Sequence, residues 1–176
     1  MATDRQKAET VHWHAVFTAS RAEKKVRDRL EELGVECFLP VQTVLRQWTY
    51  RKSRVVVPVI AGLVFVRVGR QEQVKVLQTK GVVAFLRLKG EAGAAVIPDK
   101  QMEDFRFLLD FSEEAVEMTN ENIKAGDLVR VVKGSLRGME GELIRHKGVT
   151  KVLVRIDMLG CAMVNIPASF VEKLNK

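Results

Sequence analysis

The sequence predicts an α+β protein in which an antiparallel α/β sandwich is followed by a second, small all-β module. Alternating apolar residues predict many short strands, helical patterns occur only in the first two thirds, and glycine-rich turns separate the strands near the C-terminus. An acidic segment without apolar periodicity, residues 111–124, lies between these parts and is predicted to be a linker. We therefore expect one domain over residues 11–110 and another over residues 125–176.

The first domain is expected to begin with a strand and a well-defined helix. Apolar residues alternate along His12 to Thr18, which is the period of a strand. Ser20 and Glu23 have the spacing of a capping box, and Gly34 stands where a helix needs a left-handed residue after its end. The spacing therefore predicts a helix between Ser20 and Gly34.

Short strands and two further helices are expected in the rest of this domain. Strands are predicted at Val35–Leu39, Val44–Trp48, Arg54–Val57, Gly62–Val68 and Val82–Leu88, and helices at Gln71–Gln78 and Asp99–Phe111. Gly62–Val68 is largely apolar on both faces. Either helices cover both sides of the sheet, or one side meets a partner protein.

Residues 125–144 are the most informative segment of the C-terminal part. Apolar alternation stops at Lys133 and resumes at Glu142, with a basic loop and three glycines between them, which predicts a hairpin. Further alternating residues predict five short strands, for which an SH3-like barrel is the natural closure. The expected core is Val129, Val131, Leu143, Ile144, Val152, Val154, Ile156, Val164 and Ile166, with Val171 and Leu174 in the last strand.

Charge and composition limit the classes of function. A net charge of +7 and a pI near 9.6 indicate that the partner is a polyanion or a molecular assembly that contains one. The first residues lack the apolar core of a signal peptide, and no window approaches the ~18 apolar residues of a membrane span. We expect a cytoplasmic protein without membrane contact, in which Cys37 and Cys161 are reduced core thiols.

No pattern predicts catalysis or a cofactor. His12 and His14 share one face of a strand, but no third ligand follows at usable distance, so they are expected to be structural or surface residues. The glycines of residues 134–141 lack the Gly-Lys-Ser ending of a phosphate loop. No Ser/His/Asp or Cys/His set has an interpretable spacing, so we expect a protein that is not an enzyme and holds no metal.

Two parts of the chain resemble modules of one family. Residues 125–144 resemble a KOW motif, and several N-terminal segments resemble, in the right order, the NGN domain of NusG transcription factors. The N-terminal segments are Trp13-His14-Ala15-Val16, Phe38-Leu39-Pro40, Arg51-Lys52-Ser53, Ala61-Gly62-Leu63-Val64-Phe65-Val66 and Lys80-Gly81-Val82-Val83-Ala84-Phe85-Leu86. The resemblance covers about residues 11–175, and Pro98-Asp99 followed by a helix fits the end of the NGN domain.

Two departures from the family pattern favour a specialised paralog. Family members usually have Pro-Gly-Tyr where this chain has Ala61-Gly62-Leu63, and Gly160-Cys161-Ala162-Met163-Val164 replaces the usual Gly-Arg-x-Thr-Pro-Val. Such paralogs include RfaH-like proteins and the capsule-operon antiterminators of the UpxY type in Bacteroides-type bacteria.

The resemblance implies a monomeric transcription elongation regulator that binds RNA polymerase at the clamp of its largest subunit and suppresses pausing or termination. By position, the polymerase-binding patch falls on Phe17, Ile60, Leu63 and Phe65. The competing interpretation is that these four residues are ordinary core, because large apolar residues are more often buried than binding.

The resemblance also implies contacts to nucleic acid and to a second protein. Arg21, Thr79 and Lys80 match positions that reach non-template DNA, whereas the cations Arg46, Arg51, Lys52 and Arg54 are better explained as a solvated surface. The KOW module would bind a termination factor or a small-subunit ribosomal protein. Its abundant β-branched residues from Val149 to Val164 predict stable strands with no refolding to helix.

Two other classes remain open from sequence alone. KOW modules also occur in ribosome-associated and RNA-binding proteins, which predicts a higher affinity for RNA than for polymerase. A nuclease is the third class, and the missing cluster of acidic residues argues against it.

Overall fold

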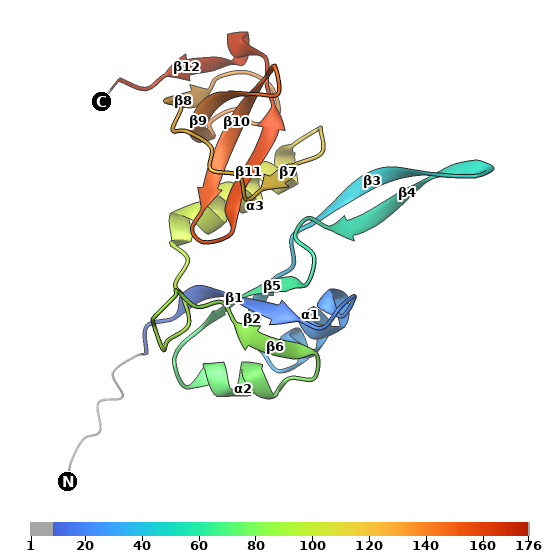
Figure 1. Cartoon of the computed structure of the whole chain (residues 1–176), viewed down its shortest axis with the longest axis vertical. Helices are drawn as coiled ribbons and strands as arrows, with labels where there is room; N and C mark the ends of the chain where they lie inside the picture. Colours follow the sequence, from blue (N-terminus) through green and yellow to red (C-terminus); the bar gives the residue numbers. More distant parts are fainter. Residues whose placement is uncertain (1–8, 176) are drawn as a thin grey trace. The chain divides into compact units, whose positions relative to one another are not determined.

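A computed structural model describes residues 9–175, which divide into two compact units. The first unit combines the chain up to Leu39 with Ala61–Pro98, and the second combines Pro40–Ile60 with Asp99 to the C-terminus (Figure 1). The mixed α/β character predicted from the sequence is confirmed. The domain boundaries expected above differ from this division, because Pro40–Ile60 and the helix after Pro98 group with the C-terminal strands.

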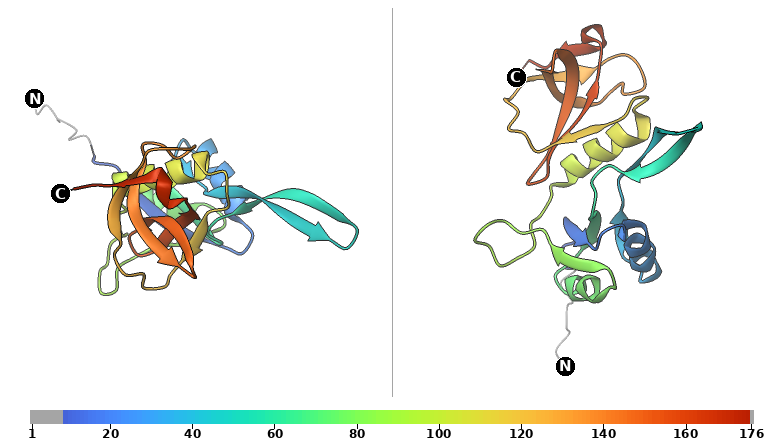
Figure 2. Two further views of the ribbon diagram at one scale, coloured as in Figure 1. Left: turned by 90° about the horizontal axis from the view of Figure 1, so that it is seen from above. Right: turned by 45° about the vertical axis from the view of Figure 1, so that its right-hand side comes forward.

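A four-stranded antiparallel sheet forms the first unit, with the order β2-β5-β1-β6. Its elements are β1 (His12–Thr18), α1 (Glu23–Glu32), β2 (Glu36–Phe38), β5 (Leu63–Val68), α2 (Glu72–Gln78) and β6 (Val82–Phe85). Because β5 lies between β1 and β2, and β1 lies between β5 and β6, each helix connects two parallel strands. Right-handed crossovers place both helices on one face of such a sheet (Figures 1 and 2). We call the opposite face, on which no helix of the first unit's described residues lies, the helix-free face.

The two ends of α1 test the capping predictions. Gly34 has a φ of 75° and its N–H donates to Glu31 O at 2.9 Å, while Val35 N–H donates to Leu30 O at 3.0 Å. These two bonds form a Schellman motif, so the predicted C-terminal cap is confirmed. The predicted capping box is wrong, because Ala22 is the N-cap and the carboxylate of Glu23 instead accepts a hydrogen bond of 2.7 Å from Gly62 N.

The second unit contains a hairpin, a helix and a six-stranded antiparallel sheet. The hairpin is β3 (Val41–Trp48) with β4 (Arg51–Pro58), and the helix is α3 (Asp99–Phe111). The sheet has the order β12-β8-β9-β10-β11-β7. Its strands are β7 (Glu117–Thr119), β8 (Asp127–Val131), β9 (Glu140–His146), β10 (Val149–Ile156), β11 (Gly160–Asn165) and β12 (Val171–Lys173), and a short 3₁₀ helix, Ala168–Phe170, precedes β12. Among residues 9–175, no helix is long and apolar enough to span a membrane.

The six-stranded sheet confirms a strand-rich C-terminal module but leaves its closure into a barrel unconfirmed. β12 and β7 are the outer strands, and no ladder joins them within the described residues. Most of the predicted core is buried, namely Val129, Val131, Ile144, Val152, Val154, Ile156, Val164 and Ile166. Leu143, Val171 and Leu174 are half-buried.

The segment predicted to be a linker is partly ordered. β7 pairs with β11, and Val116 is buried. The side-chain amide of Gln42 makes two hydrogen bonds to the backbone of Val116. Its Nε2 donates to Val116 O at 3.1 Å, and its Oε1 accepts from Val116 N at 2.9 Å. The expectation that this segment has nothing to anchor it is therefore wrong for residues 116–119. An outer strand is held by backbone hydrogen bonds, which need no apolar periodicity.

An ion pair inside the second unit makes its stability depend on pH. Arg155 donates from Nε to Glu142 Oε1 at 2.6 Å and from Nη2 to Oε2 at 2.9 Å, and Gly126 N donates to Oε2 at 3.0 Å. The Arg155 bonds, and to a smaller extent the Gly126 N–H, lower the pKa of Glu142. A carboxylate whose folded-state pKa is lowered stabilises the fold above its unfolded pKa of about 4.3, and this contribution is lost as the pH falls through the folded value.

We therefore expect acidification from neutral pH to below about pH 4 to lower the free energy of unfolding more in the wild type than in Glu142→Gln. Urea unfolding at a series of pH values measures this difference. The same pH dependence in both proteins would contradict the assignment.

Candidate functional site

The strand register brings three of the four predicted polymerase-binding residues, Phe17, Leu63 and Phe65, to one face of the sheet. Phe17 on β1 lies directly opposite Leu63 on β5, and Ala15 lies opposite Phe65. Directly opposite residues share a face of the sheet, and so do residues two apart along a strand.

Val16, on the other face, lies opposite Val64 and Phe85. Cys37 also shares that other face, and its Sγ approaches the carbonyl of Arg27 on α1. Phe17, Leu63 and Phe65 therefore lie together on the helix-free face.

Their exposure differs from the sequence-based expectation. Phe17 is 40% exposed and Ile60 is half-buried, whereas Leu63 and Phe65 are 2% and 0% exposed. The ring of Phe65 stacks on Phe38 with centroids 6.2 Å apart. The expectation of four exposed anchors is therefore wrong for Leu63 and Phe65, which are core side chains in this structure, as the competing interpretation held. Phe17 is the well-exposed member of the set.

A β-bulge adds an apolar residue beside Phe17 that the sequence reasoning missed. Phe17 pairs with Ala84 and Thr18 pairs with Val82, so Val83 is an extra residue on β6. Val83 is 65% exposed. Bulges redirect side chains at sheet ends, and only the pairing register reveals this one.

The predicted nucleic-acid contacts lie on two neighbouring loops. Ala19 N donates to Gly81 O at 2.8 Å and joins the turn before α1 to the turn before β6. We call residues 19–22 and 79–81 the basic loop pair. Arg21 and Lys80 are exposed, and Arg21 has a φ of 58°, an uncommon conformation for a residue other than glycine. Arg29 joins them, because its Nη1 donates to Lys80 O at 2.7 Å.

Thr79 does not fit the predicted role. It is 7% exposed, and its hydroxyl donates to Lys75 O at 3.0 Å at the end of α2. The nucleic-acid contact of Thr79 stays a prediction, and in this structure its side chain caps a helix.

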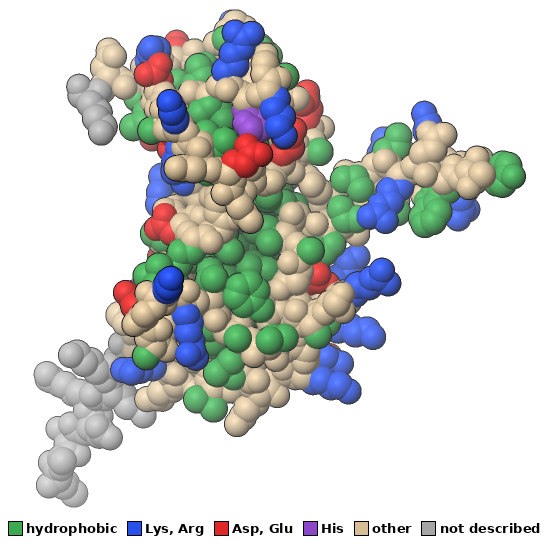
Figure 3. Space-filling model, in the orientation of Figure 1, with side chains coloured by type: hydrophobic (Ala, Val, Ile, Leu, Met, Phe, Trp, Pro, Cys, Tyr) green, Lys and Arg blue, Asp and Glu red, His purple; other side chains and the backbone are tan. Residues whose placement is uncertain are grey.

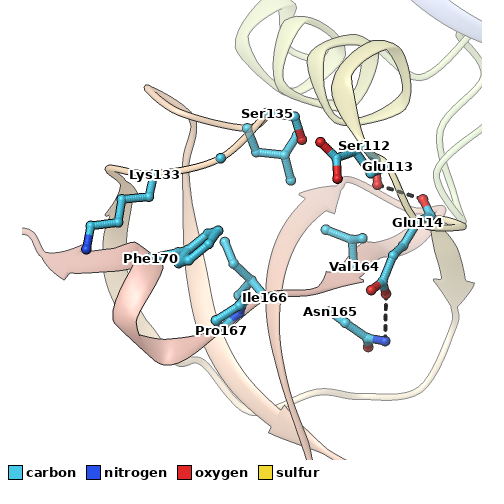
Figure 4. A pocket seen from close by; sticks show the side chains of 12 residues that line it. Ser112, Glu113, Glu114, Lys133, Ser135, Val164, Asn165, Ile166, Pro167 and Phe170 are labelled. Atoms are coloured by element: carbon cyan, nitrogen blue, oxygen red, sulfur yellow. Dashed lines mark hydrogen bonds between the residues drawn. The ribbon is translucent and has the colours of Figure 1, made fainter.

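A pocket of about 230 Å³ lies within the second unit (Figure 4). Its lining includes the apolar side chains of Val164, Ile166 and Phe170 and the carboxylates of Glu113 and Glu114. Asn165 Nδ2 donates to Glu114 Oε2 at 2.9 Å, and Ser112 Oγ donates to Glu114 O at 2.6 Å, so Glu114 is held in place. Apolar walls with acidic side chains suit an apolar side chain of a basic peptide.

The titratable groups in the core have structural partners. His14 is buried, its Nδ1 donates to Ala95 O at 2.8 Å, and burial lowers its pKa, which favours the neutral ring. The thiols of Cys37 and Cys161 are free, and burial raises the pKa of Cys37 to about 11. Within residues 9–175, no three His, Cys, Asp or Glu side chains are placed to hold a metal ion.

Comparisons with known proteins identify the family. The model of the family described as transcription termination factor NusG matches residues 11–106, more than half of the 176 residues. Among solved structures, "Domain interaction in Thermotoga maritima NusG" matches with a TM-score of 0.51 and 22% identity over 94% of this chain and 98% of that one. Two structures of an MjSpt4:Spt5 complex, conformations B and A, match with TM-scores of 0.31 and 0.29, each at 17% identity over 93% of this chain and over 97% and 99% of theirs. No curated protein matches the sequence.

A split βαβ sheet with one helix-free face, followed by an antiparallel all-β module, is the fold that this chain shares with the NusG structure. The chain belongs to the NusG family.

Proposed function

We propose that this protein is a cytoplasmic transcription elongation regulator that binds the clamp of RNA polymerase through the helix-free face of its first unit. Phe17 carries this proposal, because a large ring is two-fifths exposed on the face where the family resemblance puts the polymerase contact. Val83 extends the apolar surface, and Leu63 and Phe65 pack beneath as its support. Ile60, which the family resemblance adds to the polymerase contact, is half-buried and precedes this unit's second segment in the chain. Apolar burial is worth ~25 cal/mol per Å², and a few aromatic anchors dominate most interfaces.

Further contacts complete the proposed mode of action. The basic loop pair reaches non-template DNA with Arg21 and Lys80, because phosphates attract cations whatever the base sequence. The strained φ of Arg21 supports this role, since such conformations cluster at functional sites.

The C-terminal sheet acts as a KOW module of the SH3-like type and recruits a second protein, for which the pocket beside Phe170 is the candidate surface. Binding across the polymerase cleft suppresses pausing or termination, as in the specialised paralogs that the sequence resembles.

The test replaces Phe17 with aspartate and measures binding to core RNA polymerase. We expect binding to fall by about 30-fold or more, the effect of losing an interface hot spot. Val74→Asp is the matched control, because Val74 is also an exposed apolar residue, at 57%, but lies on α2. Binding is measured in salt that removes RNA-mediated capture, and circular dichroism verifies folding.

Equal binding of the Phe17→Asp variant and the wild type would overturn the proposed polymerase surface. Stronger retention on RNA than on polymerase for the wild type would favour the ribosome-associated or RNA-binding alternative.

A further inference from the structure

The hairpin of β3 and β4 carries a concentration of positive charge. Residues 41–58 contain four cations and no Asp or Glu. The cations are Arg46, Arg51, Lys52 and Arg54. Every residue from 45 to 52 is exposed, and Figure 3 shows blue and green side chains among tan atoms along the hairpin. The sequence alone explains these cations as a solvated surface, but the structure adds a fixed aromatic ring among them.

Trp48 is held on one face of the hairpin. Its Nε1 donates to Ser53 Oγ at 3.0 Å, and the side chain is 53% exposed. The indole N–H is its only hydrogen-bonding group, so the ring has no further polar requirement. Water nevertheless covers half of this large apolar surface. Such a ring is a preformed platform for a flat apolar ligand.

The register sorts the four cations into two pairs. Trp48 lies opposite Arg51, and Arg46 lies opposite Ser53, so Arg46 and Arg51 share the face of Trp48. Lys52 lies opposite Gln47 and Arg54 opposite Leu45, on the other face. The aromatic platform is therefore flanked by two guanidinium groups on its own side of the hairpin.

We propose that this face of the hairpin binds single-stranded nucleic acid, with an unpaired base stacked on Trp48 and adjacent phosphates on Arg46 and Arg51. Charge complementarity favours a polyanion, because the hairpin has four positive charges and no carboxylate of its own. The aromatic ring favours a strand with unpaired bases, because a base inside a duplex already has both faces stacked. Tyr50 at the turn, 97% exposed, offers a second ring for the neighbouring base.

This inference is independent of the proposed polymerase surface. The residues involved belong to the second unit, whereas Phe17 and Val83 belong to the first. A Trp48→Ala variant is therefore expected to bind polymerase like the wild type, and the two proposals fail separately.

The first experiment measures binding of the full chain to a labelled oligothymidylate about twelve nucleotides long by fluorescence anisotropy. Trp48→Ala is expected to weaken binding by about 5- to 150-fold, the usual effect of removing one stacking ring. Leu45→Ala is the matched control, because Leu45 is a 63% exposed apolar residue on the opposite face of the same hairpin. The wild type is expected to prefer the single strand to a duplex of equal length.

A second experiment separates the two faces by charge. Arg46→Gln with Arg51→Gln and Lys52→Gln with Arg54→Gln remove the same charge from opposite faces. The first pair is expected to reduce the salt slope of the affinity by about 1.4, because each phosphate contact on a single strand contributes about 0.7. The second pair is expected to change the slope by less than half as much.

Tryptophan fluorescence gives an independent readout, because Trp13 is 4% exposed and Trp48 is 53% exposed. Base stacking should quench the emission of Trp48, and the quenching should disappear in Trp48→Ala, whose Trp13 emission also verifies folding. Equal affinity for duplex and single strand would overturn the inference. So would an unchanged affinity in Trp48→Ala, or equal effects of the two charge pairs.

Discussion

Replacing Phe65 with alanine is expected to lower the free energy of unfolding by about 3–5 kcal/mol. The side chain is 0% exposed and stacks on Phe38, so its removal loses apolar burial and leaves a cavity. Thermal or urea unfolding followed by circular dichroism measures the change.

Phe17→Ala provides the comparison, because the same ring is removed from the same face of the same sheet. Phe17 is 40% exposed, so the expected loss is smaller, about 1–2 kcal/mol. Equal losses in the two variants would show that Phe65 is no more a core residue than Phe17. Polymerase binding is expected to show the opposite order. Among folded variants, Phe17→Ala should weaken binding more than Phe65→Ala, because Phe17 makes the proposed contact directly.

Gly160→Ala is expected to destabilise the second unit by about 3–5 kcal/mol. Gly160 begins β11 with a φ of 104°, a conformation that an alanine adopts only with strain. A Cβ at this position would also overlap the carbonyl oxygen of Thr119 in β7. The neighbouring outer strand would have to move, which loses its pairing to β11.

Two control glycines divide this effect into its causes. Gly138 has a φ of 94° but open space around a Cβ, so Gly138→Ala isolates the strain at about 1–2 kcal/mol. Gly93 has neither a positive φ nor a close neighbour, so Gly93→Ala should be neutral or slightly stabilising. A loss at Gly160 no larger than at Gly138 would contradict the clash with Thr119.

The polar side chains near the predicted site show why spacing alone misassigns some roles. Glu23 has the spacing of a capping box with Ser20, yet its carboxylate binds Gly62 N, 39 residues away. Thr79 precedes exposed Lys80, yet its hydroxyl caps α2. A hydrogen-bonding group takes whichever partner the fold brings within reach, and a sequence window contains only local partners.

The sequence by itself determined two features of the structure. The alternation within β5 places Leu63 and Phe65 on one face of the strand, and the position of Gly34 sets the end of α1. These features depend on spacing within a few residues, and backbone geometry converts that spacing directly into structure.

Only the tertiary structure decided which of those side chains meet water. Leu63 and Phe65 are buried, whereas Phe17 is exposed. A bulge makes Val83 an extra residue on β6, and residues 117–119 pair with β11, about 40 residues later in the chain. Exposure and edge pairing depend on which remote segments pack together. The packing of remote segments is decided by the burial and backbone hydrogen bonding of the whole chain, which a local sequence pattern does not contain.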